Sequence, residues 1–157
     1  EYTEKYMANN QNSTPSDYAR LANIYAQKAE KGGATKQASL DKAYGIYEQM
    51  AAKWPSIAAW VYNRAGMQAS KAADDERGAE FFIKAVELLS AKTDRQADDD
   101  ATFKSALANL GYYYWVTKND LETAKPYYEQ LIKLDPNDKN ARAALGLDTP
   151  AASEQQQ

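Results

Sequence analysis

The stretch between residues 107 and 136 limits the possible fold more than any other part of the chain. Its apolar and small residues recur every three or four positions, which is the spacing of one face of an α-helix. The first half carries Leu107, Leu110, Gly111 and Tyr114, and the second carries Leu121, Ala124, Tyr128 and Leu131. Pro136 ends the second half, because proline cannot continue a helix. The stretch is therefore predicted to form two amphipathic helices, with small residues where they approach and tyrosines where the gap widens.

The same order of small and aromatic residues occurs twice earlier in the chain. In the first occurrence, Leu21, Ala22 and Tyr25 precede Ala43, Tyr47 and Met50; in the second, Ala65 and Gly66 precede Gly78, Phe82 and Ala85. Corresponding small residues, Ala22, Ala65 and Gly111, are 43 and 46 positions apart. The chain is therefore predicted to be an internal repeat with lengthened units.

The order Leu-Gly-x-x-Tyr, Ala-x-x-x-Tyr and Asp-Pro in residues 107–136 resembles the tetratricopeptide repeat. The resemblance covers about residues 15–136 and is weakest in the second unit, where Arg64 replaces leucine. It implies an all-α fold, a right-handed α-solenoid of about three antiparallel helix pairs with a C-terminal capping helix. The first helix of each pair would line a concave face.

The predicted domain organisation follows this resemblance. We expect a helical remnant or connector at 1–14, a repeat domain at 15–145 and a disordered, glutamine-rich tail at 146–157. Within the domain, the expected units are about 15–55, 56–92 and 100–136, followed by a cap at 137–145. The third unit has one extra residue between Gly111 and Ala124. The chain begins at Glu1 without a methionine, which favours a processed protein or a piece of a longer one.

Composition argues against several classes of function. The 157 residues include no histidine and no cysteine, so the usual general base, activated nucleophile and zinc ligands are missing. We therefore expect no catalysis, no metal and no cofactor. The acidic runs 74–76 and 98–100 are interpreted as helix starts rather than cation ligands.

The charge pattern and the hydropathy bear on possible partners. The net charge is −3, and no run of lysine or arginine indicates a nucleic-acid partner. No stretch of about 18 apolar residues is present, so no membrane insertion is expected.

The lack of cysteine and the glutamine tail favour a bacterial periplasm or cell envelope. The 12 tyrosines would close helix seams while their hydroxyls reach water.

The candidate site is a partner-binding groove on the predicted concave face. Four consecutive aromatic residues, 112–115, cover every side of a helix, so at least one must face away from the seam. The resemblance implies that the groove contains Asn23, Gln27, Tyr62, Asn63, Asn109, Tyr112 and Trp115. Rigid aromatics beside amide side chains suit capture of a peptide or protein partner. Two alternatives stay open: these aromatics pack against neighbouring helices, or the chain is a structural or oligomerisation segment of a larger protein.

One specific binding mode of the resembled family is not expected here. Chaperone-binding members of the resembled family hold a terminal carboxylate with two lysines, two asparagines and an arginine. The matching positions here are Ala19, Asn23, Asn63, Ser105 and Asn109. Both central asparagines are present, but all three cations that would make charge-assisted bonds are missing. We therefore predict no binding of chaperone tails of that type. The sequence leaves the oligomeric state open.

Overall fold

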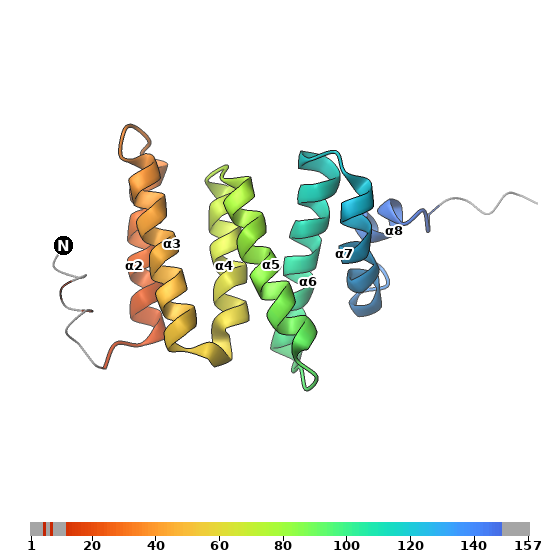
Figure 1. Ribbon diagram of the computed structural model, residues 1–157, viewed down its shortest axis with the longest axis horizontal. Helices are drawn as coiled ribbons and strands as arrows, with labels where there is room; N and C mark the ends of the chain where they lie inside the picture. The colour runs from red at the N-terminus through yellow and green to blue at the C-terminus, as the bar shows by residue number, and fades with distance from the viewer. Residues whose placement is uncertain (1–4, 6, 8–11, 149–157) are drawn as a thin grey trace, which may run out of the picture.

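The computed structural model describes Lys5, Met7 and residues 12–148, and this part of the chain is helical without any strand (Figure 1). Its α-helices are α2 (Pro15–Glu30), α3 (Lys36–Lys53), α4 (Ala58–Lys71), α5 (Asp75–Ala91), α6 (Ala97–Tyr112), α7 (Leu121–Leu134) and α8 (Lys139–Ala144). A short 3₁₀ segment, η1 (Pro55–Ile57), precedes α4, and a π-helical segment, η2 (Tyr113–Thr117), follows α6. The tail predicted to be disordered lies almost wholly outside the described residues, as does most of the predicted N-terminal connector.

The helices pack as three consecutive pairs, α2–α3, α4–α5 and α6–α7, which stand side by side in one row (Figure 1). α8 covers the end of the row, where it contacts α7 and α6 and buries Ala141 and Ala144. This arrangement confirms the predicted all-α solenoid of stacked helix pairs. Two clusters of buried side chains fill it, one around α2, α3 and α4 and the other around α5, α6, α7 and α8.

A glycine against an aromatic ring sets the helix spacing in the second and third pairs. A Cβ atom added to Gly66 would lie 2.6 Å from Cε1 of Phe82, and one added to Gly111 would lie 2.5 Å from Cζ of Tyr128. Both rings are fully buried. The helix axes can approach this closely only because these two positions carry no side chain.

The seam tyrosine of the third pair corrects one expectation. The Tyr128 side chain is 0% exposed, and its hydroxyl has no hydrogen-bond partner within the part of the chain that the structure describes. Burial raises the pKa of Tyr128 to about 12. The prediction that seam tyrosines keep their hydroxyls in water is therefore wrong for Tyr128, because the ring lies under Gly111 with the hydroxyl on the buried side.

The extra residue of the third unit is accommodated in the π-helical segment η2. The amide of Lys118 donates to the carbonyl of Tyr113, five residues back instead of four. A π turn absorbs one inserted residue and shifts every later side chain by about one position around the helix. As a result Trp115 contacts Tyr128 edge-on, with ring centroids 5.9 Å apart, while Tyr114 stacks on Tyr127.

The turns inside the pairs each use a left-handed residue. The first pair has two, Gly32 (φ 72°) and Gly33 (φ 82°), whereas the second has Ala73 (φ 61°) and the third has Asn119 (φ 53°). Glycine and asparagine adopt this conformation readily, whereas the Cβ of alanine makes it unfavourable. The second turn therefore holds local strain that the other two lack.

We predict that Gly111→Ala destabilises the protein by about 1–3 kcal/mol, because the new methyl group must displace the buried ring of Tyr128. The matched control is Gly45→Ala on α3, where no atom lies within 4 Å of the added Cβ. That change should stabilise by up to about 1 kcal/mol through helix propensity. Urea unfolding measures both variants, and equal stability of the two would contradict the close approach at residue 111.

We also predict that Ala73→Gly raises the free energy of unfolding by about 0.5–1 kcal/mol. Glycine relieves the strain of the left-handed backbone in the folded state, and this gain exceeds the free-energy cost of the more flexible unfolded chain. The converse change, Asn119→Ala, should lower it by a similar amount. Thermal unfolding followed by circular dichroism measures the two shifts. A lower melting temperature for Ala73→Gly would show that the turn is not strained.

Candidate functional site

The first helices of the second and third pairs, α4 and α6, lie against each other and run in the same direction (Figure 1). A reciprocal pair of hydrogen bonds joins them. Asn63 Nδ2 donates to Ser105 Oγ at 3.1 Å, and Ser105 Oγ donates to Asn63 Oδ1 at 3.3 Å. Asn63 is 7% exposed, so its amide satisfies its bonding needs inside the protein. We call the surface that α4 and α6 present together the α4–α6 face.

A groove of about 740 Å³ runs between the N-terminal halves of α4 and α6. From the side of η1 and α4 it is lined by Ser56, Ile57, Ala59, Trp60 and Asn63, and from the side of α6 by Gln96, Asp98, Asp99, Ala101, Thr102 and Ser105. Trp60 is 43% exposed, although tryptophan is usually well covered in folded proteins. The groove thus combines one large exposed ring with hydroxyl, amide and carboxylate groups.

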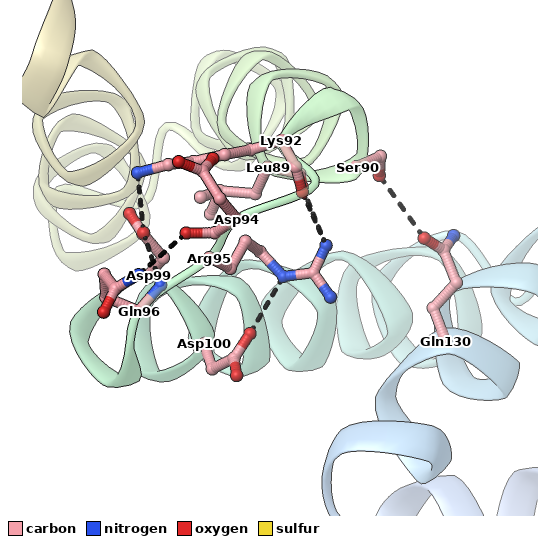
Figure 2. A network of polar contacts seen from close by, with 9 residues as sticks. All are labelled: Leu89, Ser90, Lys92, Asp94, Arg95, Gln96, Asp99, Asp100 and Gln130. Carbon is pink, nitrogen blue, oxygen red and sulfur yellow. Dashed lines mark hydrogen bonds and ion pairs between the residues drawn. The ribbon is translucent and has the colours of Figure 1, made fainter.

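A network of polar contacts fixes the turn that leads into this end of α6 (Figure 2). Arg95 donates from Nη1 to the carbonyls of Leu89 and Lys92 and from Nε to Asp100 at 2.9 Å. Lys92 Nζ lies 2.7 Å from Oδ2 of Asp99, which also accepts from the amide of Gln96. The hydrogen bond from Lys92 and the one from Gln96 lower the pKa of Asp99. These bonds hold the α6 N-terminus, and with it the acidic rim of the groove, in one position.

Exposed apolar side chains continue the α4–α6 face beyond the groove. Met67 lies one turn after Asn63 on α4 and is 53% exposed. Tyr112 ends α6 and is 52% exposed, and Val116 in η2 is 53% exposed. The surface of a soluble protein seldom carries several large apolar residues on one face unless that face binds a partner or a ligand.

The tetratricopeptide repeat model matches residues 105–138, which contain the second half of α6, the π segment η2 and α7. Residues 105–138 are therefore similar to a tetratricopeptide repeat. A search among curated proteins found no match. Tetratricopeptide repeats generally mediate protein–protein interaction, so the family supports a binding module as the class of function.

The matched repeat contains three of the predicted groove residues. Tyr112 is exposed on the α4–α6 face. The side-chain amide of Asn109 donates from Nδ2 to the backbone carbonyl of Ser105 at 2.8 Å. Trp115 is half-buried against Tyr128, because the π turn rotates it toward α7. Its ring therefore packs at least partly within the helix pair.

The other predicted groove residues lie on the earlier first helices. Asn63 forms part of the groove floor. Tyr62 is half-buried, its ring stacked 6.3 Å from that of Phe81, with Lys84 Nζ 5.2 Å from its centroid. Asn23, which is half-buried, and Gln27, which is exposed, both lie on α2 and do not line the groove. Of the seven predicted residues, the structure brings Asn63, Asn109 and Tyr112 together on the α4–α6 face.

The sequence reasoning missed Trp60, Asp98 and Thr102. Trp60 stands three positions before Asn63, so helical spacing puts the two side chains on one face of α4. Asp98 had been interpreted only as part of an acidic helix start. Its position beside α4 depends on how the α5–α6 turn folds, and no local pattern reveals that.

Two further properties of the described residues concern metal binding and membrane insertion. No group of three or more potential metal ligands occurs among them. No helix of this part of the chain has the length and apolar content needed to cross a membrane.

We predict that Asn63 and Ser105 are energetically coupled. A double-mutant cycle with Asn63→Ala and Ser105→Ala should give a coupling free energy of about 0.5–1.5 kcal/mol, the usual net value of buried hydrogen bonds. The control cycle pairs Asn63→Ala with Ser90→Ala, whose hydroxyl bonds Gln130 on α7, and should be additive. Additive effects for Asn63 and Ser105 would mean that the bonds between α4 and α6 do not form in solution.

Proposed function

We propose that the chain is a non-catalytic interaction module that binds a peptide segment of a partner protein on the α4–α6 face. The observation that carries this proposal is a row of exposed apolar side chains along two adjacent first helices and the π segment, namely Trp60, Met67, Tyr112 and Val116. The row lies beside a groove that offers hydrogen-bonding and charged groups. Large apolar and aromatic side chains of this kind form the energetic centres of protein interfaces. The face also lies on two of the first helices, which by the resemblance to a tetratricopeptide repeat are expected to line a concave surface.

The chemistry of the ionisable groups supports binding rather than catalysis. A carboxylic acid that transfers protons near neutral pH needs a raised pKa, usually through burial. Among the described residues, the carboxyl groups with a resolved shift, Asp17, Glu76, Asp99 and Asp120, all have a lowered pKa because they accept hydrogen bonds. These groups remain ionised and suit capping and ion pairing.

We predict that Tyr112→Ala weakens binding of peptides selected on the wild-type chain by about tenfold or more, the range of an aromatic interface anchor. The peptides come from a displayed random library, and fluorescence anisotropy measures their dissociation constants. The matched control is Leu88→Ala on α5, because Leu88 is similarly exposed at 44% but lies outside the α4–α6 face. Both variants should keep the wild-type melting temperature within a few degrees.

Light scattering separates this proposal from self-association. A monomer that binds peptides through Tyr112 supports the proposal. A tight dimer that Tyr112→Ala dissociates would instead make the α4–α6 face an oligomerisation surface and would contradict it.

A further inference from the structure

We propose that the groove between α4 and α6 selects an extended peptide with a lysine or arginine side chain, which pairs with Asp98 and packs its aliphatic stem on Trp60. This inference rests on the proposed function and specifies the chemistry of the partner. It is carried by the charge of the groove and by the order of residues along α6.

The groove is negatively charged. Its lining contains two carboxylates, Asp98 and Asp99, and no lysine or arginine. Asp99 is paired with Lys92, and its neighbour Asp100 is paired with Arg95. Asp98 is exposed and has no ion-pair partner within residues 12–148. One carboxylate of the acidic run thus remains available at the groove, on a helix start that the network of Figure 2 holds in place.

The cation that contacts Trp60 does not fill this position. The guanidinium of Arg64 lies 5.6 Å from the centroid of a Trp60 ring, but Arg64 does not line the groove. The groove side of Trp60 is left for the methylene groups of an incoming lysine or arginine.

The residues along α6 indicate the spacing of the peptide. Asp98, Thr102, Ser105, Asn109 and Tyr112 recur at alternating intervals of four and three, so they form one stripe on the helix. From Asp98 to Tyr112 the helix rises about 21 Å, at roughly 1.5 Å per residue. An extended chain covers that length in about six residues. A peptide that follows the stripe would therefore carry its cation about six positions from an apolar residue seated at Tyr112.

The test starts from random 12-residue peptides displayed and selected on the full chain. We expect enrichment of lysine or arginine at one position and of an apolar residue about six positions away. For a synthetic peptide of that sequence, Asp98→Asn should raise the dissociation constant roughly three- to fivefold, as for a solvent-exposed ion pair. The matched control is Glu129→Gln on α7, an exposed carboxylate outside the groove, which should change nothing.

A charge exchange makes the test specific. A peptide with glutamate in place of its cation should bind the wild type weakly and Asp98→Lys better. The inference is overturned if the selected peptides depend on Trp60 and Tyr112 but lack a cation, or if Asp98→Asn leaves their affinity unchanged; the proposed function then stands. If no peptide is enriched, or if the enriched peptides bind Tyr112→Ala as tightly as the wild type, the proposed function itself fails.

Discussion

The contact between a helix residue without a side chain and a buried aromatic ring determines how these helices pair. Gly111 lies against the ring of Tyr128, and Gly66 against that of Phe82. Each contact brings two helix axes close enough to exclude water from the seam. Because the second helix of each pair then fits beside the next first helix, the same contact also determines where α4 and α6 stand relative to each other.

The α4–α6 face is a consequence of this packing. Once α5 is seated on α4 and on α6, the two first helices lie side by side with Asn63 bonded to Ser105. The short turn held by Arg95 sets the acidic start of α6 beside α4, which creates the groove. At the other end, the π turn ends the regular helix at Tyr112 and leaves Tyr112 and Val116 exposed. π turns inside helices are often found at functional sites.

Much of the fold follows from local patterns. The spacing of Leu110, Gly111 and Tyr128 indicated paired helices, and the structure shows Gly111 against Tyr128. Local sequence patterns predicted less about the groove than about the fold. The resemblance predicted a common face for Asn63 and Tyr112, and in the structure Asn63 lines the groove while Tyr112 is exposed at the end of α6. The packing of Trp115 against Tyr128 was one of the alternatives that the sequence left open, since one inserted residue can be absorbed in a loop or in a π turn and periodicity does not distinguish the two.

The sequence by itself determined the helical class, the repeat and the side of each helix that is buried, because these depend on the order of small, apolar and polar residues over a few turns. The tertiary structure alone decided that Asp98 and Trp60 share a groove and that the Tyr128 hydroxyl is buried without a partner. These features depend on contacts between residues about 40 positions apart, or on the depth of a ring in a seam. Only the packed helices fix both.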